Sequence, residues 1–452
     1  MRFFALIAVL ISGQFLRNDS YAADPANRIG VKVVPKEDFA VKDGDVEVEL
    51  DAVRHDTVQD VKGPVKAIAD FTHAIRLNRI LAVAYNFRGQ AWYDSNELDK
   101  ALADFNEAIR LNPNFVLPYI DRGGVWRDKK ELEKAIADYD QAIQLDQTIA
   151  AAYNNRGNAW RDKKQFDKAI ADYDMAVKLA PDDAVQYLNR GNAWRDKKQF
   201  DKAIADYDEA IRLNPTLAFA YHARGIAWSD KNEHDKAIVD CDRAIQLTPN
   251  FGVAYLSRGF AWFRKEEYDR AIADFDHAIR LDPNSARAHK NRGVAWYYKK
   301  EPQKALADFS EAIRLAPNVA RGYCDRAVTY AALKQFDKST ADCEELRRIS
   351  PKGISGYNQV AWFLATSPDE NTRDGQKAIE FATKACELTE WKKGYILDTL
   401  ASAYAEAGDF EEAVKWGTNA VEFVSSNERA KVQSHLDLFK SRTPFREKVT
   451  PD

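Results

Sequence analysis

Residues 156–174 read RGNAWRDKKQFDKAIADYD, and the same nineteen residues return unchanged at 190–208. The two copies begin 34 residues apart. Aligning the chain on this Arg-Gly pair extends the 34-residue period from residue 82 to residue 353, as eight repeats without an insertion. Repeats of this kind bury their apolar residues against neighbouring repeats, so the sequence predicts a stack rather than one large core.

The first half of each repeat has the spacing of a helix. In the repeat that begins at 150, Tyr153 stands four residues before Gly157, and Trp160 follows three residues after it. These spacings place an aromatic residue, a very small residue and a second aromatic residue on one helical face. The other repeats keep the pattern, with Ala327 in place of the glycine in the eighth and His289 in place of the tyrosine in the seventh.

The second half of each repeat predicts another helix, after a short polar turn such as KKQ. Ala169, Tyr173 and Ala176 share one face at helical spacing, and Pro181 then stops the helix. Glycine and alanine let the two helices approach closely, while the aromatic residues fill the space on either side. Each buried Trp or Tyr contributes roughly 1.5–3 kcal/mol. One helix pair cannot cover its own aromatic face, so pairs must stack.

These residues resemble the tetratricopeptide repeat as found in bacterial proteins: 34 residues, helix–turn–helix, small residues at the eighth and twentieth places, and proline near the end. The resemblance implies an all-α fold, an α-solenoid in which antiparallel helix pairs stack into a right-handed superhelix. One departure is regular. Where the family pattern has Trp, Leu-Gly and Tyr, this chain has Tyr, Arg-Gly and Trp.

An arginine precedes the small residue in all eight repeats, and an aspartate precedes the central aromatic residue of the second helix, or its substitute. The arginines are Arg88, Arg122, Arg156, Arg190, Arg224, Arg258, Arg292 and Arg326, and the aspartates are Asp104, Asp138, Asp172, Asp206, Asp240, Asp274, Asp308 and Asp342. We predict an Arg–Asp ladder that ties the two helices of each repeat together. A row of anion-binding arginines is the alternative.

The N-terminus has a different composition. Residues 1–22 place Arg2 before a short apolar run, with Ser20 and Ala22 as the small residues that a signal peptidase accepts. The run is shorter than the roughly 20 residues of a spanning helix. We therefore predict a cleaved secretory signal and export to the periplasm or the medium, with no membrane insertion after cleavage. An uncleaved membrane anchor is the alternative.

Residues 23–64 alternate apolar and polar residues in VKVV and VEVELDAV, with a glycine-containing turn at KDGD. They predict a small β-rich appendage, and they resemble the first strands of an SH3-like module that precedes such repeats in some bacterial proteins. The second half of that module is missing. Residues 65–81 then supply a degenerate half-repeat, a second helix without its first.

The C-terminal part continues the pattern with longer spacers. Residues 354–393 predict a repeat-like pair with a long turn, 394–426 another pair, and 427–452 a capping helix and tail with Val432, Leu436 and Phe439 on one side. The turn PDENTRDG has some resemblance to a calcium loop. Gly375 is out of step for an EF-hand, however, so a polar loop is the favoured interpretation.

Charge and cysteine content exclude several classes of protein. Charged residues form 30% of the chain, interspersed in sign, and the net charge of −4 lacks the basic excess of a nucleic-acid-binding surface. The four cysteines are too few for a disulfide framework. Cys241 and Cys343 stand where other repeats have Tyr or Phe, which predicts buried small residues. A Cys324–Cys343 disulfide is the alternative.

No catalytic group of residues emerges from the sequence. The seven histidines are scattered, and there is no Cys-x-x-Cys, no glycine-rich phosphate loop and no serine nucleophile elbow. The sequence predicts no enzyme, no metal site and no cofactor. Binding remains, and the resemblance implies that the first helix of each repeat lines a concave groove through its second, fifth, ninth, twelfth and thirteenth places.

Carried onto this chain, those places predict a groove with an Asn/Arg cluster followed by an apolar and aromatic stretch with two basic residues. The candidate residues are Asn154, Asn158, Arg161, Asn192, Arg195, Phe219, Ile226, Leu256, Phe260, Phe263, Arg287, Lys290, Tyr297 and Tyr298. The cluster suits a peptide backbone or a carboxylate, and the aromatic stretch suits apolar side chains. The alternative is a groove of solvated polar residues whose aromatics are covered by an intramolecular tail.

The favoured function is an exported, non-enzymatic scaffold that binds a protein or peptide segment, and no nucleic acid, in this groove. A cell-wall or glycan binder is the second hypothesis, since exposed aromatic rings flanked by carboxylates stack on sugars. An enzyme with a site hidden from sequence inspection is the third. The sequence does not determine the oligomeric state or the partner.

Overall fold

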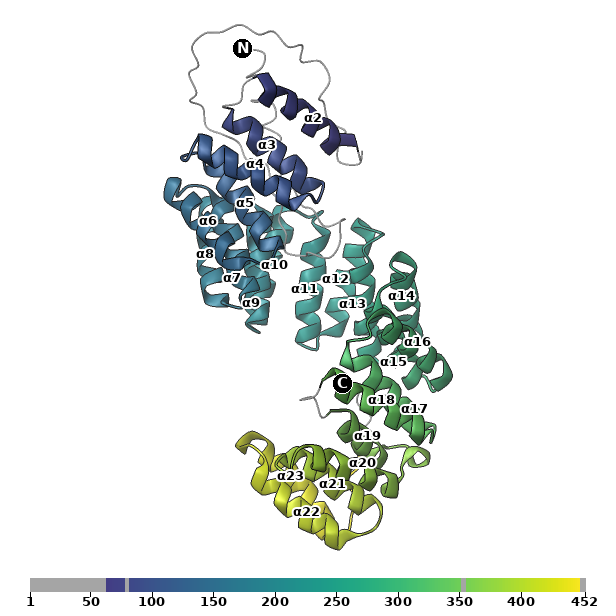
Figure 1. Cartoon of the computed structure of the whole chain (residues 1–452). Helices are drawn as coiled ribbons and strands as arrows, with labels where there is room; N and C mark the ends of the chain where they lie inside the picture. Colours follow the sequence, from purple (N-terminus) through teal and green to yellow (C-terminus); the bar gives the residue numbers. More distant parts are fainter. Residues whose placement is uncertain (1–61, 78–80, 351–354, 448–452) are drawn as a thin grey trace. The chain divides into compact units, whose positions relative to one another are not determined.

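The computed structural model describes residues 62–77, 81–350 and 355–447, and the described chain is built from helices joined by short turns, with no strand (Figure 1). It divides into two compact units, 1–231 and 232–452, each described by itself below. The predicted signal at 1–22 and most of the β-rich segment at 23–64 lie outside the described residues.

The described residues of the N-terminal unit form one single helix, then four helix pairs and a first helix. Their bounds are α2 Lys62–Leu77, α3 Ala82–Asp94, α4 Leu98–Leu111, α5 Val116–Asp128, α6 Leu132–Leu145, α7 Ala150–Asp162, α8 Phe166–Leu179, α9 Ala184–Asp196, α10 Phe200–Leu213 and α11 Ala218–Asp230. Helix α2 begins before residue 65, so residues 62–64, predicted as part of the β-rich segment, are helical. Pro64 is compatible with this, because the first turn of a helix tolerates proline.

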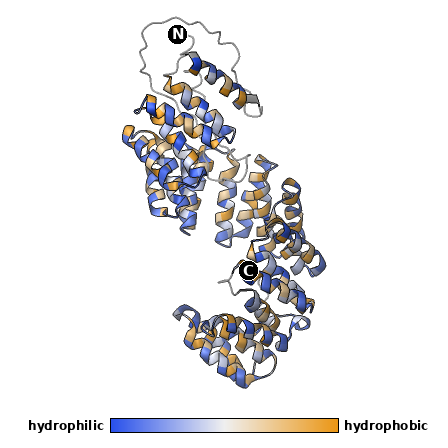
Figure 2. Cartoon of the chain, in the orientation of Figure 1, coloured by the Kyte–Doolittle hydropathy of each residue, from blue (hydrophilic) through white to orange (hydrophobic). Residues whose placement is uncertain are grey.

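The C-terminal unit continues with second and first helices in alternation. Their bounds are α12 His234–Leu247, α13 Gly252–Arg264, α14 Tyr268–Leu281, α15 Ala286–Tyr298, α16 Pro302–Leu315, α17 Ala320–Ala332, α18 Phe336–Ile349, α19 Ser355–Thr366, the 3₁₀-helix η1 Glu370–Thr372, α20 Gly375–Leu388, α21 Gly394–Glu406, α22 Phe410–Phe423 and α23 Ser426–Lys440. Helices of both units carry hydrophobic and hydrophilic residues side by side (Figure 2), as amphipathic helices in a stack require.

First helices line the inner side of each stack. Within each unit, successive first helices such as α5, α7 and α9, or α13, α15 and α17, contact one another. Contacts of this extent do not occur between successive second helices of the described chain. We call the side lined by α3, α5, α7, α9 and α11, and by α13, α15, α17, α19 and α21, the inner face.

The turn inside each of the eight 34-residue repeats is built without glycine. A lysine, asparagine or glutamate adopts a left-handed backbone there, for example Lys130 at φ 62° and Lys164 at φ 59°. The amide of the next residue, Glu131, donates to the carbonyl of Trp126 at 2.9 Å. This closure satisfies carbonyls that the first helix leaves free at its end.

The repeated glycine is required by close contact with the second helix. A Cβ atom on Gly191 would lie 2.6 Å from the ring of Tyr207, and one on Gly293 would lie 2.7 Å from the ring of Phe309. These rings are fully buried. Sequence spacing predicted the close approach of the two helices, and the structure adds that the glycine faces the central aromatic ring, sixteen residues on.

The eighth repeat shows the reciprocal exchange. Ala327 replaces the glycine and Cys343 replaces the aromatic residue sixteen positions later, and both are buried in one cluster. A larger residue on the first helix is thus matched by a smaller one on the second. All four cysteines are buried and free, so the predicted burial is confirmed and no Cys324–Cys343 disulfide forms.

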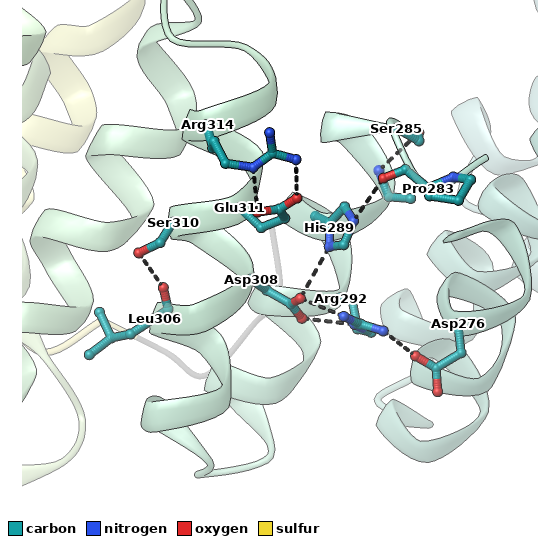
Figure 3. Close-up of polar contacts among 11 residues, drawn as sticks. Asp276, Pro283, Ser285, His289, Arg292, Leu306, Asp308, Ser310, Glu311 and Arg314 are labelled. Atoms are coloured by element: carbon teal, nitrogen blue, oxygen red, sulfur yellow. Dashed lines mark hydrogen bonds and ion pairs between the residues drawn. The ribbon is translucent and has the colours of Figure 1, made fainter. Parts of the chain in front are cut away.

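The Arg–Asp ladder is confirmed, and it extends further than predicted. Figure 3 shows Arg292 between two carboxylates: Nε and one terminal nitrogen donate to Asp308 at 2.8 and 2.6 Å, and the other terminal nitrogen donates to Asp276 at 2.6 Å. Asp308 lies on α16 of the same repeat, whereas Asp276 lies on α14 of the preceding one. The ladder therefore joins successive repeats as well as the two helices of each.

The contact with the preceding repeat recurs, but its acceptor varies. It is an aspartate for Arg156, Arg190, Arg224 and Arg258, and it is Thr72, Asn106 or Ser310 for Arg88, Arg122 and Arg326. Arg156 bonds Asp172 and, in the preceding repeat, Asp140, while Arg190 bonds Asp206 and Asp174. Because every arginine is held by protein carboxylates, its role is structural. The alternative of a row of anion-binding arginines is not what the geometry supports.

The C-terminal end agrees with the predicted cap. Val432, Leu436 and Phe439 are buried on α23. In the loop PDENTRDG, Asp369 accepts from the Asn371 amide at 3.1 Å, and Asp374 accepts from the Lys377 amide at 3.0 Å as the cap of α20. These two carboxylates are engaged in capping.

Candidate functional site

The Asn/Arg cluster predicted from the repeats at 150 and 184 lies on the adjoining inner helices α7 and α9. Asn158 and Asn192 occupy the same place in their repeats, and both are almost fully buried. Their side-chain oxygens accept from the hydroxyls of Tyr173 and Tyr207 at 2.8 and 2.9 Å. The tyrosines thus fix the amides, whose nitrogens are buried without a hydrogen-bond partner in the described chain.

A row of ion pairs crosses the same helices. Arg161 Nε donates to Asp196 at 2.6 Å, and Arg127 Nε donates to Asp162 at 3.0 Å. Each pair joins residues 35 apart, from the twelfth place of one repeat to the thirteenth of the next. These arginines are therefore engaged with carboxylates of the protein itself, and an external carboxylate would have to displace them.

Two further members of the cluster are also engaged within the protein. Asn154 accepts from the Asn189 side-chain amide at 2.9 Å, again 35 residues apart. A terminal nitrogen of Arg195 lies 3.9 Å from a carboxylate oxygen of Asp196. Burial raises the pKa of Asp230, and the nearby charge of Arg195 counteracts part of that rise. The predicted cluster exists as a group of neighbouring side chains, and most of its polar capacity serves to join first helices.

Phe219 and Ile226 lie on α11, in the N-terminal unit, and both are half-buried. Phe219 packs against the buried cluster that includes Leu217 and Ala220. The structure thus places these two residues and the remaining apolar candidates in different units.

The aromatic candidates of the C-terminal unit divide into a ring cluster and one exposed ring. Phe263 contacts Tyr298 at 5.3 Å, Tyr298 contacts Tyr297 at 5.8 Å, and Tyr297 contacts Phe363 at 6.4 Å between ring centroids. Phe263 is only 5% exposed, whereas Phe260 is 40% exposed. The pair Phe263–Tyr298 has the 35-residue spacing of the ion pairs, so an aromatic contact replaces them here.

The C-terminal unit also contains a polar group, formed by Lys290 on α15 with Arg321 and Asp325 on α17. Asp325 accepts from Arg321 Nε at 3.1 Å through one oxygen, while its other oxygen is buried without a hydrogen-bond partner in the described chain. Burial raises the pKa of Asp325 and lowers the pKa of Lys290, and each charge opposes the effect on the other. No ion pair within 4.0 Å joins Lys290 to Asp325 in the described residues. Arg287 is exposed on α15, and Leu256 is buried on α13.

Sequence inspection missed the partners on the next first helix. Asp196 and Asn189 were absent from the predicted site, although they bind its Arg161 and its Asn154, and the pair Arg127–Asp162 was missed altogether. A signal was present: an Arg-Asp dipeptide ends the first helix in consecutive repeats, at 127–128, 161–162 and 195–196. Residues 35 apart meet across first helices, so this dipeptide indicates an ion-pair row.

The described residues contain neither a candidate metal centre nor a candidate membrane-spanning helix. No group of three or more His, Cys, Asp or Glu side chains there could hold a metal ion. None of the helices in the described part of the chain combines the length and the apolar character that crossing a membrane requires.

Family models described as tetratricopeptide repeats match residues 82–115, 150–183, 184–217 and 261–320, and one described as a TPR repeat matches 123–160. No curated protein gives a significant match. Many solved structures are similar, among them the following three.

YrrB, described as a TPR protein with an unusual peptide-binding site, is 25% identical, with 41% of this chain and 95% of YrrB covered and a TM-score of 0.33. MamA is 28% identical, with 36% of this chain and 96% of MamA covered and a TM-score of 0.33. Yeast Tom70 is 16% identical, with 84% of this chain and 93% of that chain covered and a TM-score of 0.45.

The helix pairs, the glycine contact with the second helix and the family models agree over the same residues. Residues 82–115, 123–217 and 261–320 of this chain are tetratricopeptide repeats.

Proposed function

We propose that this protein is a non-catalytic, exported scaffold whose inner face binds an extended segment of a partner protein. The observation that carries the proposal is the Lys290–Asp325 group on α15 and α17. Residues that recur in every 34-residue repeat, such as the glycines and the Arg–Asp ladder, make the contacts that hold the stack together. Lys290 and the second oxygen of Asp325 belong to first helices of the inner face and do not make such stacking contacts.

A peptide backbone fits what this group lacks. Its carbonyl can accept from the Lys290 amino group, and its N–H can donate to the second oxygen of Asp325 if this side chain turns toward the ligand, because that oxygen is buried. A buried polar group without a partner costs free energy, which a bound peptide would recover. Phe260 is exposed on α13, a first helix that contacts α15, and adds an apolar side chain to the inner face. The C-terminal unit is therefore a better candidate for ligand binding than the Asn/Arg cluster, whose arginines are already paired.

The glycan alternative finds less support in the same region. Stacking on a sugar needs an exposed ring face flanked by carboxylates. Phe263, Tyr297 and Tyr298 are engaged with one another and with Phe363, which leaves Phe260 as the exposed ring of the four. The contacting helix α15 carries the basic residues Arg287 and Lys290 rather than carboxylates.

We expect the double substitution of Phe260→Ser and Lys290→Ala to weaken binding of a captured partner at least ten-fold, because it removes the apolar contact and the donor together. The measurement is capture from envelope and cytosolic extracts, followed by the Kd of the captured protein. Tyr297 is left intact, since its ring is part of the cluster that supports α15 and α19.

The matched control is Val239→Ser on the second helix α12, where Val239 is 66% exposed. It should leave binding unchanged. If the inner-face variant keeps its helical circular dichroism and still captures the same envelope proteins with the same Kd, the proposed surface is wrong. Partners found in the cytosolic extract and absent from the envelope extract would contradict the proposed location.

A further inference from the structure

Residues 443–447 lie against the C-terminal turns of α19 and α21. Helix α23 ends at Lys440, and Arg442 adopts φ 57°, which turns the backbone out of the helix. The Thr443 amide donates to the carbonyl of Leu438 at 2.9 Å and fixes this turn. Residues 443–447, which we call the tail, then contact the first helices α19 and α21, which precede them by some 40 to 80 residues in the sequence.

The tail places an aromatic ring among two others. The Phe445 ring lies 4.1 Å from the ring of His435 and 5.6 Å from the ring of Trp362, between centroids. His435 is itself fixed, because its Nδ1 lies 2.9 Å from a carboxylate oxygen of the buried Asp398. The aromatic residue of the tail thus fits a preformed apolar place on α19 and α23.

Arg446, which follows Phe445, lies between a carboxylate and a backbone carbonyl. One terminal nitrogen of Arg446 lies 2.5 Å from Glu406, and the other lies 3.4 Å from the carbonyl of Ala365. Ala365 stands in the last turn of α19, where unpaired carbonyls and the helix dipole favour a cation. Glu406 is also held by Arg373 Nε at 3.0 Å, so it stays in position without the tail.

The backbone of the tail is recognised too. The Glu447 amide donates to the carbonyl of Thr366 at 2.9 Å, and Trp362 Nε1 donates to the Glu447 carboxylate at 3.2 Å. The tail thus makes three kinds of contact that a bound peptide can also make. These are an aromatic contact for Phe445, a carboxylate for Arg446 and a carbonyl acceptor for a backbone amide. Here all three are made by a segment of the same chain.

We propose that the C-terminal turns of α19 and α21, together with His435 on α23, form a second peptide-binding site, which the tail occupies as an internal ligand. Its external ligand is a partner segment with an aromatic residue directly followed by arginine, because these two side chains make the ring and ion-pair contacts. The proposal rests on the premise of the proposed function, that inner faces hold peptide segments, but it concerns other helices and other residues.

The test uses the full chain with Phe445→Ala and Arg446→Ala, which empties the site, and a fluorescent peptide of sequence SRTPFRE, residues 441–447, as the probe. We expect the variant to bind the peptide at least ten-fold more tightly than the natural chain does. In the natural chain the attached tail competes at a high effective concentration. A peptide with both alanines should not bind, and Glu406→Gln added to the variant should weaken binding of the natural peptide.

Helical circular dichroism and the melting temperature establish whether the variant is folded. If the double variant does not fold, the single substitution Arg446→Ala replaces it in the test. A folded variant that binds no peptide would overturn the proposal, as would equal binding by the natural chain. A dimer of the natural chain that the variant lacks would also overturn it, since it would indicate exchange of tails between copies. The Phe260 and Lys290 substitutions should not affect this peptide, so the two proposals can fail separately.

Discussion

Replacing Arg190 by methionine should lower the free energy of unfolding of the N-terminal unit by about 3–5 kcal/mol, because it leaves a buried carboxylate without its partner. Arg190 donates twice to Asp206, at 2.9 and 2.6 Å, and once to Asp174 at 2.8 Å. Asp206 is only 7% exposed. Urea unfolding followed by far-UV circular dichroism measures the loss.

Arg212→Met on α10 is the matched control. Arg212 is a solvent-exposed arginine that pairs with Glu209 three residues away on the same helix, so its removal should leave the unfolding curve almost unchanged. Combining Arg190→Met with Asp206→Leu should recover part of the stability, since no unpaired charge then remains buried. Equal losses for Arg190→Met and Arg212→Met would contradict a structural ladder.

The loss at Arg190 should depend on pH. Burial raises the pKa of Asp206, and Arg190 opposes that rise, so the substitution raises the pKa further. A carboxyl whose pKa is raised on folding stabilises the fold below its ordinary pKa of about 4, and this stabilisation is lost as the pH rises. The variant should therefore be closest to the natural protein in acid, and the gap should widen towards pH 7.

The second large effect concerns two adjacent glycines on α5. A Cβ atom on Gly123 would lie 2.6 Å from the fully buried ring of Tyr139, whereas one on Gly124 would have no atom nearer than 3.6 Å, the hydroxyl of Tyr93. Gly123→Ala should destabilise the unit by about 1–3 kcal/mol, because a packed ring must shift. Gly124→Ala should stabilise it by about 0.5–1 kcal/mol, because alanine favours the helix.

Both variants add one methyl group to the same helix, so their difference in thermal and urea unfolding reports packing alone. Opposite signs for the two substitutions are the expected result. If Gly123→Ala is as stable as Gly124→Ala, the glycine is not required by contact with the second helix.

Much of the fold could be predicted from the residues that recur. A glycine, an arginine and an aromatic residue at fixed spacing solve one packing problem, and the solution is local to neighbouring helices, so it can be read from a single repeat. The exchange of Gly and aromatic residue for Ala327 and Cys343 follows the same rule. The ladder was visible for the same reason, although its contact with the preceding repeat was not.

The candidate site was predicted less completely, because its residues do not recur. Whether Arg161 is available to a ligand depends on Asp196, which belongs to the next repeat. Whether Phe263 is exposed depends on Tyr268 and Tyr298, from two other helices. The contact of Phe445 with Trp362 joins residues far apart in the sequence, and no spacing pattern announces it.

The central claim is that repeated residues build the stack while the inner face of the C-terminal unit holds a peptide. A photoreactive amino acid placed at Phe260 on the inner face, and in a second protein at Val239 on the outer helix α12, tests it most directly, since both side chains are exposed. We predict that a partner is crosslinked from position 260, that excess unlabelled partner peptide abolishes this, and that position 239 gives no crosslink. Crosslinking of the same partner from position 239, with none from 260, would contradict the claim.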